Sequence, residues 1–173
     1  TAIFMPTSVI NLAAGFVIRP FLTKLSYRWE LKQLEDFKNI IFKIFIIIIV
    51  LTLIAVGGAW LIGVPVLGLV FNVELAPFKL GLILSIVGGG FNAMLNLFYY
   101  VLVIMKKQRY IFFGYALVCA AALFLAPALV RAGGINGGAV SYLILMIAVT
   151  LCFAGASMLV FVQEKKTRQV LKR

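Results

Sequence analysis

The chain has 173 residues, of which 64% are hydrophobic, with 16 Lys and Arg against five Asp and Glu, two Cys and no His. Apolar runs of about twenty residues recur, which indicates an integral membrane protein and excludes the soluble, disordered, collagen-like and disulfide-rich classes. The lack of His excludes Ser-His-Asp and Cys-His nucleophile systems, and imidazole-based metal sites, within this chain.

Five apolar runs, taken in chain order, predict an all-α polytopic membrane helix bundle with about five transmembrane helices. The runs cover residues 2–18, 40–62, 80–105, 111–130 and 138–162. The first run is expected to stop at Arg19-Pro20, because proline disrupts a helix interior. The chain starts with Thr1 and has no charged lead-in, so we expect it to be the C-terminal piece of a longer protein.

The connections between the runs differ in character. Residues 21–39 mix charges with spaced apolar side chains, which predicts a cytoplasmic amphipathic helix in the headgroup plane or, alternatively, a docking site for a partner. Residues 63–78 are apolar but interrupted by Gly and Pro, which predicts a segment at the outer interface. The glycine-rich residues 133–138 predict a tight outer turn.

The basic residues predict how the chain is oriented. Three connections, at residues 19–43, 106–109 and 165–173, hold 14 of the 16 Lys and Arg. With five alternating helices these connections fall on one side, which the positive-inside rule assigns to the cytoplasm. The N-terminus is then outside and the C-terminus inside, so most of the net charge of +11 reports topology and not nucleic-acid binding.

Neutral polar residues form one face of the run 80–105. They occur at spacings of 4, 3, 4 and 3, which is the spacing of a helix face. An amide in hydrocarbon needs a partner, so this face has two interpretations: hydrogen bonds to another helix with close approach at the glycine triplet 88–90, or the wall of a hydrated cavity. The face consists of Ser85, Gly89, Asn92, Asn96 and Tyr99.

The first run carries a second polar stripe, made of Ser8, Asn11 and Gly15. Arg19 closes this run at its cytoplasmic end. Its guanidinium either reaches the headgroups of surrounding lipid or contacts a phosphate of a lipid-linked substrate.

The order of several short motifs is similar to that of a known family. A polar helix ends in Arg-Pro before a basic loop, a glycine-rich stretch follows the next helix, and a long helix with Asn92 and Asn96 precedes a basic turn. The motifs are RPFLTKL at residues 19–25, GVPVLGLVFN at 63–72, KKQR at 106–109 and GINGGAVSY at 134–142. In this order the chain resembles the C-terminal part of polysaccharide-biosynthesis flippases in the multidrug/oligosaccharidyl-lipid/polysaccharide exporter superfamily.

The resemblance implies a partial C-terminal lobe of a bacterial plasma-membrane flippase, which exports lipid-linked oligosaccharide repeat units by alternating access. The implied partners are membrane lipids, a polyprenyl-pyrophosphate-linked oligosaccharide and the N-terminal lobe of the same protein, with no nucleic acid. We expect no catalytic residue, metal or cofactor. The candidate residues of the substrate cavity are Asn11, Arg19, Asn92 and Asn96.

Three alternatives remain open. A cation-coupled multidrug exporter of the same superfamily needs an acidic residue within the membrane, and the five acids all lie in connections or at the tail. A membrane acyl- or glycosyltransferase needs a catalytic acid or His in a pocket. A non-transporting scaffold subunit would have an Asn92 face that apolar helices seal from any hydrated cavity.

Overall fold

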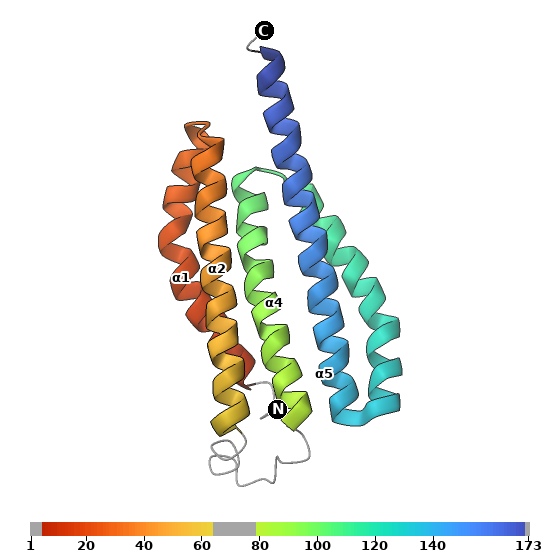
Figure 1. Ribbon diagram of the computed structural model, residues 1–173. Helices are drawn as coiled ribbons and strands as arrows, with labels where there is room; N and C mark the ends of the chain where they lie inside the picture. The colour runs from red at the N-terminus through yellow and green to blue at the C-terminus, as the bar shows by residue number, and fades with distance from the viewer. Residues whose placement is uncertain (1–4, 64–78, 172–173) are drawn as a thin grey trace.

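The computed structural model describes residues 5–63 and 79–171, and in these residues the chain is a bundle of helices without a strand (Figure 1). This confirms the predicted all-α class. The elements are α1 (Met5–Glu30), α2 (Leu34–Gly58), a π-helical turn η2 (Ala59–Gly63), α4 (Lys79–Ile104) and α5 (Gln108–Leu171).

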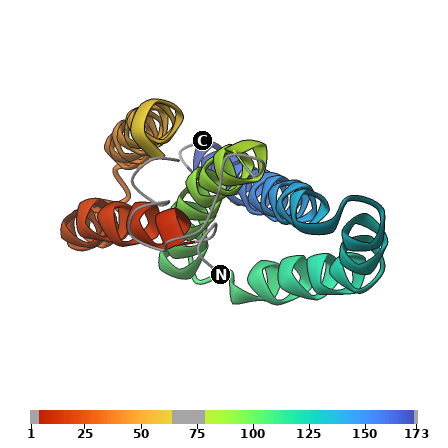
Figure 2. The ribbon, with the colours of Figure 1, turned by 90° about the horizontal axis from the view of Figure 1, so that it is seen from below.

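Helix α4 forms the centre of the bundle. It packs against α1 and α2 on one side and against α5 on the other (Figure 2). One apolar cluster joins Ala93 and Leu97 of α4 to Ile18 of α1 and Ile44 of α2. Helix α4 therefore links the pair of α1 and α2 to α5.

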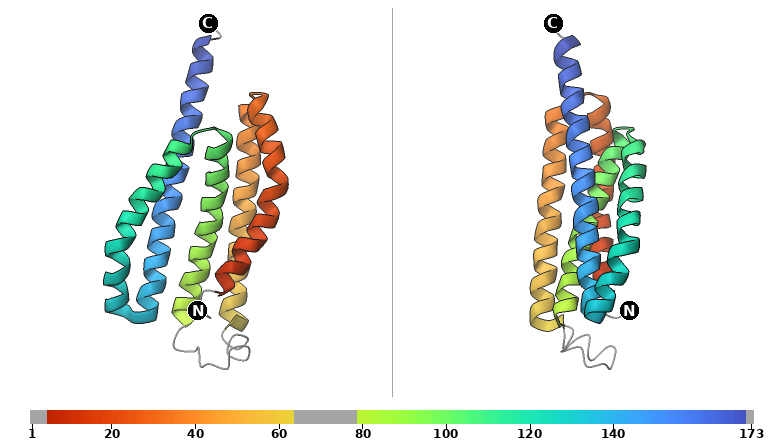
Figure 3. Two further views of the ribbon diagram at one scale, coloured as in Figure 1. Left: turned by 180° about the vertical axis from the view of Figure 1, so that it is seen from behind. Right: turned by 90° about the vertical axis from the view of Figure 1, so that its right-hand side faces the viewer.

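Helix α5 folds back on itself at Gly134, as Figure 3 shows. Gly134 has φ 56° and ψ −131°, a conformation that only glycine adopts readily. A Cβ at Gly137 would clash with the backbone carbonyl of Leu129, so the hairpin needs glycine at this second position too. The two parts are called the first arm (Gln108–Gly134) and the second arm (residues 136–171), and their hairpin is the tight turn predicted at 133–138.

Four helical segments of the described residues are long and apolar enough to cross a membrane. They are Leu34–Leu61, Leu80–Ile104, Gln108–Gly134 and Asn136–Lys166. Together with α1, which is not among them, the described part of the chain holds the five helical segments that were expected. The predicted interfacial segment 63–78 lies outside the described residues, except for Gly63.

The first helix does not stop at Arg19-Pro20. Helix α1 continues through Pro20 to Glu30, and α2 begins at Leu34, so the expected end of the first helix at residue 18 and the separate helix at 21–39 are both wrong. The reason is tertiary packing: Leu25 is only 1% exposed and Trp29 lies 5.0 Å from Phe37 between ring centroids. Burial of these apolar side chains in the bundle outweighs the cost of a proline inside the helix, which is about 3 kcal/mol.

The other helices differ from the prediction mainly at their ends. Helix α2 starts at Leu34 instead of residue 40, because Phe37 is fully buried in the same cluster as Leu25. Helix α4 agrees with the predicted 80–105 to one residue at each end. The two arms of α5 extend beyond the predicted 111–130 and 138–162 at both ends.

The two turns at one end of the bundle are built alike (Figure 1). In the first, Lys32 N–H donates to Trp29 O and Gln33 N–H donates to Arg28 O; Lys106 and Lys107 repeat this pattern after α4. These are Schellman motifs, in which the first residue after the helix takes a left-handed conformation. Lys32 has φ 61° and Lys106 has φ 57°. We call this the basic end.

Helix α5 returns to the basic end and projects beyond it (Figure 1). There Lys165 Nζ lies 3.7 Å from Glu35 Oε1 in the first turn of α2. The turns at residues 31–33 and 105–107 and the end of the second arm thus share one end of the bundle. The expectation that the three basic connections fall on one side agrees with this course of the chain.

Candidate functional site

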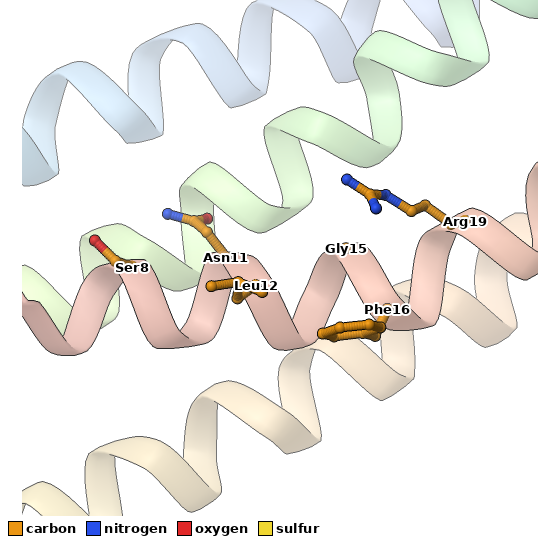
Figure 4. Close-up of a pocket in the computed structure, with 6 residues that line it drawn as sticks. All are labelled: Ser8, Asn11, Leu12, Gly15, Phe16 and Arg19. Carbon is orange, nitrogen blue, oxygen red and sulfur yellow. The ribbon is translucent and has the colours of Figure 1, made fainter.

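The polar stripe of α1 lines a pocket of about 360 Å³. Figure 4 shows Ser8, Asn11 and Arg19 projecting from the same side of α1, towards α4 in that view. The complete lining is Ser8, Asn11, Leu12, Gly15, Phe16 and Arg19. The structure therefore brings together Asn11 and Arg19, two of the four residues predicted for the cavity.

Asn11 lines this pocket and carries a hydrogen-bond acceptor without a partner in the described part of the chain. Its Oδ1 is buried and has no hydrogen-bond partner among the described residues. Burying an amide oxygen without a donor costs about 1–3 kcal/mol. Arg19 is exposed and supplies five N–H donors with a permanent positive charge. The pocket thus combines the amide side chain of Asn11 with a cation that can donate hydrogen bonds to an anion.

The polar stripe of α4 is present, but its members differ in environment. Ser85 is fully buried and its hydroxyl donates to Gly81 O at 2.8 Å. Asn96 Nδ2 donates to the backbone carbonyl of Asn92 at 3.1 Å, and both asparagines are partly buried. Asn92 and Asn96 are adjacent on one helix and do not line the α1 pocket.

The register of α4 places Asn92 and Asn96 between its two packed faces. Ala93 and Leu97 pack with α1 and α2, whereas Leu95 packs with α5. Because successive residues are turned by about 100°, the asparagine face lies between these faces.

Close helix approach, the other interpretation of the α4 stripe, also occurs. A Cβ at Gly88 would lie 2.6 Å from Tyr142 Cε1, and a Cβ at Gly90 would clash with Thr52 of α2. The glycine triplet therefore lets α5 and α2 approach α4. The two interpretations apply to different residues. The glycines allow close packing of the helices, and the asparagines remain partly exposed.

One interhelical hydrogen bond was not predicted. The Thr150 hydroxyl lies 3.0 Å from Phe91 O and 2.6 Å from Met146 O, so its proton is shared between α4 and its own helix. Thr150 is 59 residues away from Phe91, and nothing local in the sequence pairs them. A single threonine in an apolar run gives no signal of its partner.

A second feature missed from the sequence is a larger, mostly apolar pocket of about 720 Å³ between the end of α4 and the first arm of α5. It begins at Tyr99, the last member of the α4 stripe. Its aromatic members from the first arm are Phe112 and Tyr115, and Cys119 lies at its far side. Cys119, which is exposed, and Cys152 are free thiols.

The described acids lie at the ends of helices. Glu35 and Asp36 are in the first turn of α2, Glu30 ends α1, and Glu164 lies near the end of the second arm. Among the described residues no group of three His, Cys, Asp or Glu side chains could hold a metal ion. Chemistry in this part of the chain rests on amides, hydroxyls and basic side chains.

Comparison with known proteins adds no assignment. No family model, no curated protein and no solved structure matches the chain. The four long apolar helices assign it to the membrane-embedded helical proteins.

Proposed function

We propose that this chain is part of a cell-membrane exporter that flips lipid-linked oligosaccharide repeat units in bacterial surface-polysaccharide biosynthesis, by alternating access. The observation that carries the proposal is the pocket on α1, where the amide side chain of Asn11, whose Oδ1 has no partner among the described residues, and the cation Arg19 line the same space. Such a substrate offers both matching groups: hydroxyls that donate and a pyrophosphate that accepts.

The position of the asparagine face supports this function. Asn92 and Asn96 are partly buried amides on α4, the helix against which α1 packs, and they are the further partners proposed for sugar hydroxyls. Asn96 Nδ2 is used by Asn92 O, which leaves Asn96 Oδ1 and the Asn92 side chain for a ligand. These groups would form one wall of the cavity, and the N-terminal lobe of the same protein would form the other wall.

The closest competing function is cation-coupled drug export. That mechanism places an acid near the middle of the membrane to bind the coupling ion. In the described residues the acids occupy helix ends, at or near the basic end. Neutral amides with one arginine suit a large hydroxylated anion better than a lipophilic cation.

The test is export in cells that carry the whole protein with Asn92→Leu plus Asn96→Leu, or with Asn11→Leu. We expect each variant to insert normally and to lower surface polysaccharide about tenfold, which corresponds to about 1.4 kcal/mol. Thr23→Leu is the matched control, because Thr23 is an exposed polar residue of α1 outside the pocket. Normal surface polysaccharide in both asparagine variants would contradict the proposal.

A transport assay separates the two exporter functions. Purified whole protein in vesicles should move a lipid-linked oligosaccharide from one leaflet to the other. Efflux of a lipophilic cation that depends on a proton or sodium gradient, without movement of the lipid-linked sugar, would favour the multidrug exporter instead.

A further inference from the structure

A second polar pocket, of about 240 Å³, lies between α1 and α2 near the basic end. One side is Arg28, in the last turn of α1. The other side is a face of α2, on which four residues recur at spacings of 3, 1 and 3. These are Asp36, Asn39, Ile40 and Lys43.

The charges in this pocket leave one cation without a partner. Arg28 Nη1 lies 3.1 Å from Asp36 Oδ2 and also donates to Gln33 Oε1, so the carboxylate is neutralised and the guanidinium is held in place. No carboxylate in residues 5–63 and 79–171 forms an ion pair with Lys43. The pocket therefore has a net charge of +1, with the free ammonium of Lys43 beside the amide of Asn39.

The position of Lys43 along α2 fixes its depth in a bilayer. The helical part of the charge-free stretch that follows it, residues 44–63, is about 30 Å long at 1.5 Å per residue. This length matches the hydrocarbon core of about 30 Å. The ammonium of Lys43 therefore lies where the core ends and the phosphates of one leaflet begin.

On the side of the pocket away from the basic end, the same face of α2 carries a row of exposed apolar side chains, which we call the apolar track. Ile47, Val50 and Ile54 follow Lys43 at spacings of 4, 3 and 4, and they are 38%, 48% and 67% exposed. They share one helix face with Lys43, because these are helical spacings. A polar pocket with a free cation thus continues directly into an exposed hydrophobic stripe.

We infer that this pocket binds the phosphate of an anionic phospholipid. The ammonium of Lys43 and the amide N–H groups of Asn39 donate to the phosphate oxygens, and an acyl chain runs along Ile47, Val50 and Ile54. The apolar track is the reason for assigning a lipid and not free phosphate. Basic pockets between membrane helices on the cytoplasmic side commonly hold such headgroups. The site is separate from the α1 pocket and does not depend on the proposed function.

The test measures binding of phosphatidylglycerol to the delipidated whole protein by native mass spectrometry, with phosphatidylcholine as the neutral comparison. We expect Lys43→Gln to weaken phosphatidylglycerol binding about tenfold, about 1.4 kcal/mol. Lys38→Gln is the matched control: it removes the same charge from an exposed position of α2 outside the pocket. It should change binding by less than about twofold, the range of a screened surface charge.

Three results would overturn the inference. Equal weakening by Lys43→Gln and Lys38→Gln would mean that general surface charge attracts the lipid. No weakening by Lys43→Gln would remove the site altogether. Competition by inorganic phosphate that displaces phosphatidylglycerol fully would show a free-phosphate site with no contribution from the apolar track. A Lys43→Arg variant guards against loss by misfolding, because it keeps the charge and should keep most of the binding.

Discussion

The ring of Tyr142 on the second arm of α5 packs against Gly88 of α4, where a Cβ would lie 2.6 Å from Cε1 of the ring. The contact joins the helix at the centre of the bundle to the second arm of α5. It also explains one of the three consecutive glycines in a membrane helix, since glycine allows this approach and any other residue would displace the ring.

We therefore predict that Gly88→Ala destabilises the bundle by about 1–3 kcal/mol, the usual cost of overpacking. Gly155→Ala is the control, because nothing lies within 4 Å of a Cβ there. Alanine is the better helix former, so the control should be neutral or stabilising by up to about 1 kcal/mol. Thermal unfolding in detergent would compare the two. Equal stability changes for both variants would show that Tyr142 does not press on Gly88.

The continuation of α1 through Pro20 makes a second prediction, about two leucines six residues apart. Leu25 is 1% exposed inside the bundle, whereas Leu31 in the following turn is 49% exposed. Leu25→Ala should cost at least about 2 kcal/mol and Leu31→Ala less than about 0.5 kcal/mol. An amphipathic helix in the headgroup plane would instead give small and similar losses in detergent. Chemical unfolding of both variants distinguishes the two arrangements.

The ends of some helices can be predicted from the sequence alone, and the ends of others cannot. The limits of α4 could be predicted closely, because charged Lys79 and Lys106 bound its apolar run. The α5 hairpin could be predicted from the glycine-rich residues 133–138, because glycine readily adopts the conformation that Gly134 has in this turn. The end of α1 could not be predicted, because Arg19-Pro20 is a strong local signal for the end of a helix and only tertiary contacts overcome it.

The candidate site divides in the same manner. Helical spacing was enough to place Asn92 with Asn96, and Asn11 with Arg19, because each pair lies on one helix. Contacts between different helices could not be predicted from the sequence. The hydrogen bond from Thr150 to Phe91 O joins residues far apart in sequence, and only the packed bundle reveals it.

A third prediction concerns Lys106, whose φ of 57° is costly for any residue with a Cβ. Lys106→Gly should stabilise the protein by about 1 kcal/mol, because glycine is the preferred residue at this position of a Schellman motif. Lys107→Gly removes the same charge without a left-handed residue and should be neutral or destabilising. Unfolding midpoints of the two variants, measured in the same detergent, separate the effect of the backbone conformation from the effect of removing a charge. A gain of equal size in both would instead point to relief of charge repulsion.

The lysines at these turns bear on the orientation of the chain. Positive charge is kept at two positions where the backbone favours glycine, at the end of the bundle that the positive-inside rule assigns to the cytoplasm. With Cys119 and Cys152 first replaced by Ala, we predict that Gln33→Cys and Lys107→Cys react with an impermeant maleimide only from the inside. Gly133→Cys, in the hairpin at the opposite end, should react only from the outside. Labelling of Gly133→Cys from the inside would reverse the orientation.

Arg19 gives the sharpest test of the pocket on α1. An arginine that only reaches lipid headgroups is replaced well by lysine, whose long chain does the same. An arginine that binds a pyrophosphate uses its planar fork for paired hydrogen bonds, which an ammonium cannot reproduce.

The last prediction follows from that difference. Arg19→Gln should lower export about tenfold, and Arg19→Lys should restore only part of the loss, with insertion unchanged in both. Lys24→Gln is the matched control, because Lys24 is an exposed cation on the same helix and does not line the pocket. Transport of a lipid-linked oligosaccharide by the purified whole protein is the measurement. Full activity of Arg19→Lys would assign the guanidinium to headgroup contact and leave Asn11 as the polar centre of the pocket.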